Sequence, residues 1–338
     1  MTGRLGIVAI GRNEGERLRA CLRSVVGEDR VVVYVDSGST DGSVAMARSM
    51  GADVVELDLS TPFTAARARN EGFGRVMKID PNVERVQFID GDCEVVAGWL
   101  DRAADELNKD AKLAVVCGRR RERHPEATVY NRLCDMEWDT PVGEAKACGG
   151  DAMIRASAFR EVNGYDQSVI AGEEPEMCVR LRERGWTIRR IDAEMTLHDA
   201  AMTRLGQWWK RNVRAGHAAA EGYAMHGAPP ERHGAHRVRS NWIYGVVLPL
   251  VALALAWPTR GISLVILLAY PLLAWRVAGH ERRRGRSARD ARVHGFFVAL
   301  GKFPQAIGQA RYHWGRIAGH RSGLIEYKGG GAPAVGAR

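Results

Sequence analysis

The chain has 338 residues, 46% of them apolar, which is enough apolar surface for a sizeable core and excludes a disordered chain. The length allows one large domain or two smaller ones. The net charge of +9 favours an anionic partner, such as a nucleic acid, anionic lipid or a phosphorylated ligand. Six arginines face two acids within residues 281–292, beside apolar segments, so a membrane surface is favoured over a nucleic acid.

Two features bear on the cellular compartment. The six cysteines are scattered and none forms a C-x-x-C pair, which is typical of free thiols in a reducing compartment. The apolar run at the N-terminus is too short for a signal peptide. We therefore expect the N-terminal domain to lie in the cytoplasm.

Short apolar runs rich in valine and isoleucine alternate with helical patterns over the first 120 residues. The runs predict strands buried on both faces, at residues 5–10, 31–35, 53–57, 85–89 and 113–117. The stretches between them predict helices, at residues 15–26, 42–50, 63–78 and 96–108. This alternation predicts an α/β domain with a mostly parallel sheet and helices on both faces.

The next 80 residues mix both patterns. The sequence predicts a helix at "NRLCDMEW", a loop, strand and short helix at "GGDAMIRASAFREV", and a strand at "WTIRRI". Between them, "EPEMCVRLRERG" has Pro175 near its start and Gly185 just past its end, which predicts a helix.

The remaining chain predicts attachment to a membrane. Two apolar segments, residues 241–257 and 262–275, are separated by "PTRG" and carry aromatic residues near their ends. They predict a helical hairpin that crosses or dips into a bilayer, and the basic flanks place both ends in the cytoplasm. A buried hairpin of a soluble protein is the alternative.

We expect five regions along the chain. They are an α/β domain at 1–225, a basic linker at 226–240, the hairpin at 241–277, a basic amphipathic region at 278–328, and a disordered tail at 329–338.

Polar residues follow the predicted strands, where ligands bind in such sheets. "IGRNEGERL" follows the first strand, and Asp36 ends the second strand, where its carboxylate can accept from a base or a ribose hydroxyl. Asp41, in the turn after it, is expected to cap a helix. Arg69 and Asn70 point from a helix toward the same region.

Asp90 and Asp92 come directly after a buried strand. In an extended stretch, residues two apart project to the same side, and Gly91 between them adds no side chain. Two close carboxylates repel unless a cation joins them, and Mg²⁺ or Mn²⁺ suits oxygen ligands and can bridge a diphosphate. A D-x-D pair also occurs by chance in surface loops, so its position after the strand carries the interpretation.

In order, the segments "GRNEGERLRACLRSV", "VDSGSTDGS", "ARARNEG", "FIDGDCEV" and "GYDQSVIAGEEPEMCVRLRERG" resemble the family-2 glycosyltransferases, which are inverting enzymes of the GT-A fold. The resemblance covers roughly residues 5–215 and implies a nucleotide-sugar donor, with a UDP-sugar as the default. It implies that the donor is bound by Glu14, Asp36, Arg69, Asn70 and Asp90. It also implies Mn²⁺ or Mg²⁺ on Asp92, with Asp90 and His198 as further ligands, although a lone histidine is more often structural.

The resemblance also indicates the catalytic base and the acceptor site. The family base is the aspartate of a Glu-Asp pair, and Glu173–Glu174 stands at that place here. Glu174 is the candidate base, and the alternative is two acids favoured by a helix N-terminus. Gly149, Gly150 and Asp151 are expected to form part of the acceptor site. Trp208, in "GQWWKRNVRAG", is a further acceptor candidate or a buried tryptophan.

These observations together predict a membrane-associated hexosyltransferase. It would transfer sugar with inversion to a lipid-linked saccharide, at the cytoplasmic face of the inner or plasma membrane, in cell-surface glycan synthesis. No nucleic acid partner is expected. A polyprenyl-phosphate glycosyltransferase and an inactive, membrane-tethered nucleotide-binding scaffold are the alternatives.

Overall fold

The computed structural model describes residues 4–61 and 63–319, which form two compact units. We call the first the sheet unit; it comprises the chain through Glu126, Arg132–Ala200 and Glu221–Gly234. We call the second the helical unit; it comprises Ala127–Asn131, Ala201–Ala220 and the chain from Ala235 on.

The domain boundary expected at residue 225 differs from these units. Helix α8, Leu205–His226, belongs to the helical unit up to Ala220. The expected linker contains helix α9, Ala235–Trp242, so its second half is regular structure. The tail expected to be disordered lies outside the described residues.

The sheet unit is built on one mixed sheet, whose nine strands within the described residues follow the order β3-β2-β1-β4-β8-β6-β9-β5, with β7 also paired to β9. The strands are β1 Leu5–Gly11, β2 Arg30–Asp36, β3 Asp53–Glu56, β4 Arg85–Asp90, β5 Cys93–Val95, β6 Leu113–Glu122, β7 Gly143–Glu144, β8 Ala152–Arg155 and β9 Thr187–His198. Strands β1 to β4 pair in parallel, as do β6 and β9, whereas β5, β7 and β8 run antiparallel to their neighbours.

The strands expected before residue 120 are all present, and the later elements also form. The helices of this part of the chain are α1 Glu16–Val25, α2 Ser43–Ser49, α3 Ala65–Ile79, α4 Trp99–Lys109, α5 Val129–Glu137, α6 Ala156–Glu161 and α7 Glu173–Glu183. Asp41 accepts a hydrogen bond from the backbone nitrogen of Ser43, the first residue of α2, at 3.0 Å, but the N-cap position of this helix is Gly42 and not, as had been expected, Asp41.

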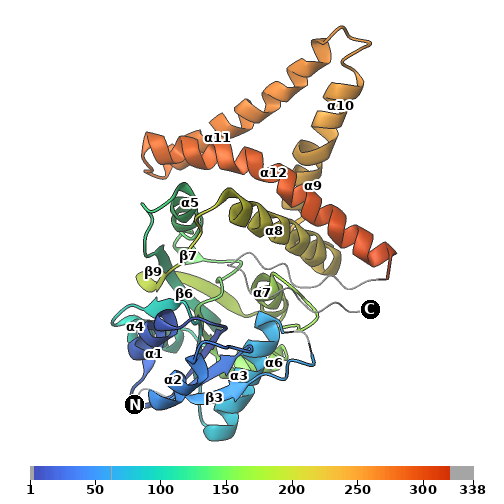
Figure 1. Ribbon diagram of the computed structural model, residues 1–338. Coiled ribbons are helices and arrows are strands. Elements are labelled where there is room, and N and C mark those ends of the chain that lie inside the picture. The colour runs from blue at the N-terminus through green and yellow to red at the C-terminus, as the bar shows by residue number, and fades with distance from the viewer. Residues whose placement is uncertain (1–3, 62, 320–338) are drawn as a thin grey trace. The chain divides into compact units, whose positions relative to one another are not determined.

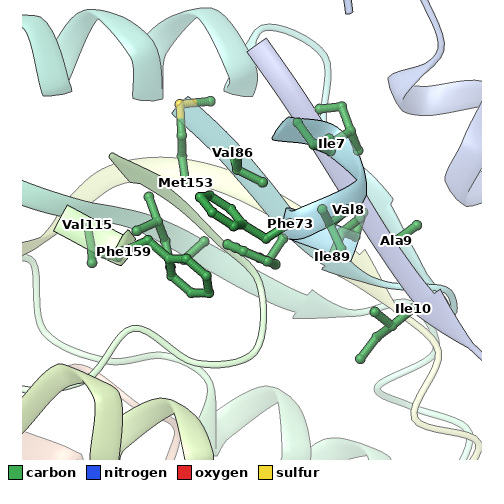
Figure 2. Packing of buried hydrophobic residues seen from close by; sticks show 14 of the residues in the cluster. Ile7, Val8, Ala9, Ile10, Phe73, Val86, Ile89, Val115, Met153 and Phe159 are labelled. Atoms are coloured by element: carbon green, nitrogen blue, oxygen red, sulfur yellow. The ribbon is translucent and has the colours of Figure 1, made fainter. Parts of the chain in front are cut away.

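Two glycines let α3 approach the sheet closely. A Cβ on Gly72 would lie 2.4 Å from Val8, and one on Gly6 would lie 2.6 Å from Val76 of α3. Because side chains alternate along a strand, Ile7 and Ala9 project to the opposite face of the sheet. Aromatic rings fill the α3 side, where the ring centroids of Phe73 and Phe159 lie 4.5 Å apart (Figure 2).

The helical unit contains the C-terminal helices. Helix α9 continues through a π-helical turn, Ile243–Val247, into α10, Leu248–Ala254. After a turn, a 3₁₀ segment at Ile262–Leu268 leads into α11, Ala269–Arg283, and α12 follows at Ala288–Ile317 (Figure 1). Pro249 explains the π-helical turn, because its nitrogen carries no proton for the regular helical hydrogen bond.

The expected helical hairpin is therefore present, and its surface is apolar. The continuous helical stretch Ile262–Arg283 is long and apolar enough to cross a membrane, the one such stretch among the described residues, and 6% of its most apolar window is buried. Large apolar side chains on both arms are exposed, including Leu250 at 61%, Leu253 at 64% and Val265 at 62%. A surface of this kind is typical of a membrane or protein contact.

Candidate active site

The carboxyl ends of three parallel strands meet at one edge of the sheet. Gly11 at the end of β1 pairs with Asp36 of β2, and Ile10 pairs with Asp90 of β4. The register therefore brings together two acidic residues that lie 54 positions apart in the sequence.

Asp36 organises the loop after β2. It is 2% exposed, and one carboxylate oxygen accepts from the Tyr34 hydroxyl at 2.9 Å. The other oxygen accepts from the backbone nitrogens of Gly38 and Ser39, at 2.9 and 2.7 Å. The carboxylate thus fixes the backbone of this loop. A nucleoside could bind to Asp36 only by donating a further hydrogen bond to one of the two carboxylate oxygens.

Glu14 lies in the loop after β1, with 13% of its side chain exposed, and forms an ion pair with Arg17 at 2.7 Å. Its side chain borders two glycines, since a Cβ on Gly11 or Gly91 would lie 3.1 or 3.5 Å from the Glu14 Cγ. Glu14 and the D-G-D turn are therefore neighbours at the strand ends.

Arg69 links two acidic residues. Its guanidinium is 3% exposed and donates to Asp90 Oδ1 at 2.8 Å and to Glu173 Oε1 at 2.7 Å. Burial opposes the charge of Arg69, but the two carboxylates outweigh it and raise its pKa. Burial would likewise raise the pKa of Asp90, whereas Arg69 and Arg120 lower it, and the net pKa of Asp90 is lowered. Asp90 is therefore held ionised beside two fixed cations.

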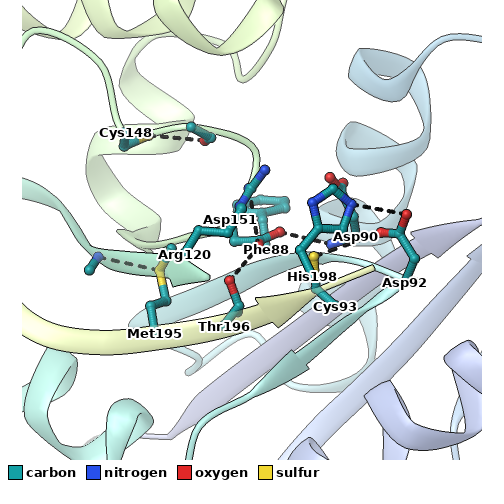
Figure 3. A network of polar contacts seen from close by, with 12 residues as sticks. Phe88, Asp90, Asp92, Cys93, Arg120, Cys148, Asp151, Met195, Thr196 and His198 are labelled. Atoms are coloured by element: carbon teal, nitrogen blue, oxygen red, sulfur yellow. Dashed lines mark hydrogen bonds and ion pairs between the residues drawn. The ribbon is translucent and has the colours of Figure 1, made fainter. Parts of the chain in front are cut away.

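A second buried ion pair supports Asp90. Asp151 is fully buried, accepts from the Asp90 backbone nitrogen at 3.0 Å and from the Thr196 hydroxyl at 2.8 Å, and pairs with Arg120 at 3.1 Å (Figure 3). Asp151 therefore positions Asp90, and the expectation that it contacts an acceptor is wrong, because no part of it reaches the surface.

Gly150 keeps the space beside these charges open. A Cβ at this position would lie 3.0 Å from Arg69, 3.1 Å from Asp90 and 3.3 Å from Arg120. Gly149, next to it, has a φ of 81°, a conformation that favours glycine. The two glycines thus lie beside the anionic and cationic groups, and their place in the wall of an acceptor site stays a prediction.

Asp92 meets His198 across the antiparallel pair of β5 and β9. Cys93 pairs directly with His198, and the Asp92 Oδ2 atom lies 3.1 Å from His198 Nε2 (Figure 3). Ligand atoms of Asp92, Cys93 and His198 all lie within 4.8 Å of one another. A buried carboxylate and an imidazole at this distance fit a divalent cation such as Mn²⁺, so the residues present suit the implied metal.

Glu174 faces the loop that precedes β8. It is 7% exposed, and its Oε1 atom accepts from the Cys148 backbone nitrogen at 2.5 Å and the Cys178 thiol at 3.1 Å. Burial raises the pKa of Glu174, although these hydrogen bonds act against the shift. The two neighbouring glutamates thus have different partners. Glu173 pairs with Arg69, and Glu174 accepts a hydrogen bond from the loop that contains Gly149.

Two further predicted site residues make other contacts in the structure. The side-chain amide of Asn70 donates to the Tyr165 carbonyl at 2.7 Å and accepts from the Tyr165 nitrogen at 2.9 Å, so it holds this stretch of backbone in place. Trp208 is 2% exposed and packs on Phe297, with ring centroids 5.1 Å apart. It is a buried core residue of the helical unit and not an acceptor contact.

The sequence interpretation missed Arg120 and Trp138. Arg120 lies 5.5 Å from the centroid of the Trp138 ring, which lies 4.6 Å from the His198 ring. The run "RRRERH" signals cations on a strand, but only the sheet order shows which arginine turns toward Asp151.

Comparisons with known proteins agree with this geometry. Residues 7–161 match the model of glycosyl transferase family 2, and residues 134–204 match a family described as the N-terminal domain of galactosyltransferase. The chain is 26% identical over 225 residues to a pre-mycofactocin glycosyltransferase of Mycobacterium tuberculosis, covering 62% of this chain and 45% of that protein. It therefore spans less than half of that relative's length.

Two further proteins are similar. Glycosyltransferase AglE of Haloferax volcanii is 22% identical over 217 residues, covering 60% of this chain and 69% of that protein. A solved structure, the mannosyltransferase PcManGT from Pyrobaculum calidifontis in complex with GDP-Man and Mn²⁺, superposes with a TM-score of 0.61 at 16% identity. That match covers 91% of this chain and 87% of the other, and it shows a shared GT-A-like fold. Residues 7–161, somewhat less than half of the chain, are thus similar to glycosyl transferase family 2.

Proposed function

We propose that this protein transfers a sugar from a nucleoside-diphosphate sugar to an acceptor, with a divalent cation bound at the site. One observation carries the proposal. Arg69, fixed between Asp90 and Glu173, lies at the same edge of the sheet as the Asp92–His198 pair. A fixed cation and a candidate metal site are what a diphosphate leaving group requires.

Asp92 and His198 would hold the cation, with Asp90 beside them, and its charge would stabilise the departing diphosphate. Asp36 and Glu14 border the nucleoside side through the loops after β2 and β1. Arg69 holds Asp90 and Glu173 in place. The solved neighbour is a complex with GDP-Man and Mn²⁺, and this supports a nucleotide-sugar donor and a divalent cation here.

Glu174 is the proposed base for a hydroxyl acceptor. It would take the proton of the hydroxyl while the oxygen attacks the anomeric carbon and the bond to the diphosphate breaks. This single displacement inverts the anomeric centre. Glu174 must become exposed on acceptor binding, and the adjoining segment Cys148–Gly150 is the one whose movement would expose it.

The acceptor is proposed to be a lipid-linked saccharide of a cell-surface glycan, held at the cytoplasmic face of the membrane. The exposed apolar arms of the hairpin and the arginines at residues 282–292 support this proposal. A membrane-anchored enzyme meets an acceptor that is itself confined to the membrane.

A polyprenyl phosphate is the second candidate acceptor. The burial and raised pKa of Glu174 favour it, because a phosphate oxygen is already ionised near neutral pH and needs no strong base. In that reaction the lipid phosphate oxygen attacks the anomeric carbon and the nucleoside diphosphate leaves.

The test is a thermal-shift screen of UDP, GDP and their sugars with and without Mn²⁺, followed by assay of sugar-nucleotide hydrolysis. We expect a metal-dependent rise of the melting temperature with one nucleotide series, because a ligand that binds the folded state alone stabilises it. Asp92→Asn, folded as judged by its melting temperature, should lose that metal dependence and at least about 100-fold in turnover. Nucleotide binding without any turnover would support the inactive scaffold, and no nucleotide binding would refute the proposal.

A further inference from the structure

Arg190 is a buried cation with little compensation. It lies on β9, paired with Cys117 of β6 on one side and with Gly143 of β7 on the other, and it is 4% exposed. Its Nε atom has no hydrogen-bond partner. Among residues 4–61 and 63–319, the ion contact found for its guanidinium is Asp139 Oδ1, at 3.8 Å. A buried charge with so few hydrogen bonds destabilises the protein unless a ligand forms the hydrogen bonds that are missing.

Arg119 faces the same carboxylate. Its Nε atom lies 3.6 Å from Asp139 Oδ1, while its other nitrogens pair with Asp135 at 3.1 Å and donate to the carbonyls of Arg120 and Asp135 at 2.7 and 3.0 Å. Both of these arginine contacts to Asp139 are longer than a hydrogen bond. Asp139 is 42% exposed at its side chain, so one carboxylate lies between two guanidinium groups and the solvent.

The neighbouring cation, Arg121, already has a close acidic partner. Arg121 pairs with Glu194 at 2.7 Å and lies 3.6 Å from Asp135. Burial lowers the pKa of Arg119, and Arg121 and Arg190 add to the shift, whereas Asp135 and Asp139 oppose it. Arg119 and Arg190 are thus the two cations that a further anion would stabilise.

The position of this pair connects it to the active site. Asp139 follows Trp138 in the chain, and the Trp138 ring contacts both His198 and Arg120. A ligand held by Arg119 and Arg190 would therefore lie beside Asp139, the residue that follows Trp138, whose ring packs on His198 of the candidate metal site. The proposed donor site is formed by other residues, Arg69 and the Asp92–His198 pair, so we assign the ligand here to the acceptor.

We propose that Arg119 and Arg190 form a subsite for an anionic group of the acceptor, a phosphate, and that the Asp139 carboxylate occupies it until the acceptor displaces it. This proposal rests on the proposed function and names the acceptor class: a phosphate-bearing molecule. A guanidinium pair suits phosphate, because each fork can donate two parallel hydrogen bonds to its oxygens. For the two arginines, the phosphate would replace the long contacts to Asp139 by short hydrogen bonds.

The experiment measures phosphate binding by calorimetry in the full-length protein in detergent. The donor site is first filled with the nucleotide that gives the largest thermal shift, in the presence of Mg²⁺. Inorganic phosphate is one probe, and geranyl phosphate in detergent micelles is the other. Arg123→Gln is the matched control, since Arg123 forms an exposed pair with Glu94 just beyond the end of the same strand, β6.

We expect Asp139→Asn to bind inorganic phosphate at least about fivefold more tightly than the wild type, because the competing carboxylate is gone. Arg190→Gln should lose at least about tenfold, Arg190→Lys should recover part of the loss, and Arg123→Gln should bind as the wild type does. Tighter binding of geranyl phosphate than of inorganic phosphate would identify a lipid phosphate as the source, and equal binding would identify the phosphate group alone.

The contrary results are distinct. If Asp139 is only a structural bridge, Asp139→Asn will lower the melting temperature and leave phosphate binding unchanged or weaker, and the proposal is overturned. Wild-type phosphate binding by Arg190→Gln overturns it as well. If Arg190→Gln does not fold, the Asp139→Asn result alone decides. If a variant gives one of these contrary results but binds nucleotide normally, this inference fails and the proposed function stands.

Discussion

The two units of this protein bury polar groups in opposite ways. In the sheet unit many buried polar groups are charged and form ion pairs, as in Arg69 with Asp90 and Arg120 with Asp151. In the helical unit the buried polar groups are mostly neutral amides and imidazoles, while large apolar side chains face outward. The first pattern suits an ionic ligand from water, and the second is typical of helices packed in a lipid environment.

The packing of the helical unit strengthens this contrast. A Cβ on Gly216 of α8 would lie 2.0 Å from a backbone oxygen of Gln305 in α12, so these two helices touch through small residues. Beside that contact, Gln305 donates to Asn212 at 2.9 Å. Close contact through glycines and hydrogen bonds between helices are common where lipid surrounds the helices. Glu281 is the charged exception, and it pairs with Arg286 at the turn between α11 and α12.

The largest expected effect tests Glu174, a buried carboxylate of the sheet unit whose hydrogen bonds come from a backbone nitrogen and a thiol. Glu174→Gln should lower kcat by about 100-fold or more if the acceptor is a hydroxyl, because a positioned base contributes that much. Glu173→Gln, the matched control, removes the partner of Arg69 and should mainly raise KM for the donor. A phosphate acceptor would instead leave Glu174→Gln with nearly full kcat. Steady-state kinetics on both variants separates these outcomes.

The pH dependence of the same group has a defined sign. Since the pKa of Glu174 is raised, the acidic limb of kcat should lie at higher pH than for an ordinary carboxylate. The folded state also holds this proton more tightly than the unfolded chain does. Wild-type stability should therefore fall relative to Glu174→Gln as the pH rises through the folded pKa. A stability difference that does not change with pH would contradict the raised pKa.

The second prediction tests the apolar exterior of the helical unit. Replacing Leu250, Leu253 and Val265 by serine should weaken partitioning into anionic lipid vesicles by at least about tenfold, because each buried apolar side chain contributes about 1.5–3 kcal/mol. Nucleotide-induced thermal shifts should persist. Ile79→Ser, at a 44% exposed position of the sheet unit, is the control and should bind vesicles normally. Unchanged partitioning of the triple variant would show that the hairpin covers a protein partner.

The contrast between the units also explains what could be predicted from the sequence. Local patterns suffice for β1 to β4, because parallel buried strands are continuous apolar runs that end in polar residues. The same patterns place Asp36 and Asp90 at one edge. Pairings that depend on the order of the strands in the sheet could not be predicted. An example is the pairing of Cys93 with His198, which brings His198 next to Asp92. Nothing local distinguishes Asp151, which is fully buried, from an acceptor contact.

Two other residues, Asn70 and Trp208, make contacts that could not be predicted from the local sequence. Asn70 follows Arg69 on α3, but its amide matches the donor and acceptor of the Tyr165 backbone, a contact 95 residues away in the sequence. Trp208 lies in a segment that mixes aromatic and basic residues, and only the packing of Phe297 on it shows which side is buried. Composition gave the type of these residues, whereas long-range contacts decide their role.

The smallest expected effect concerns His217, which tests whether the helical unit tolerates a buried charge. His217 is 2% exposed, and burial lowers its pKa to about 4. The unfolded chain takes up this proton near pH 6.5, whereas the folded chain does not until about pH 4. The stability that the neutral His217 contributes is therefore fully present above pH 6.5 and is lost as the pH falls between these values, since the unfolded state binds more protons there.

In detergent, the melting temperature of the wild type should fall over this interval by roughly 2–6 °C more than that of His217→Asn, in which the titrating group is absent. His236→Asn, at an exposed position of α9, should follow the wild type. Equal slopes for all three proteins would mean that the interior of the helical unit accommodates the charge, and the contrast with the sheet unit would then lie in the apolar exterior alone.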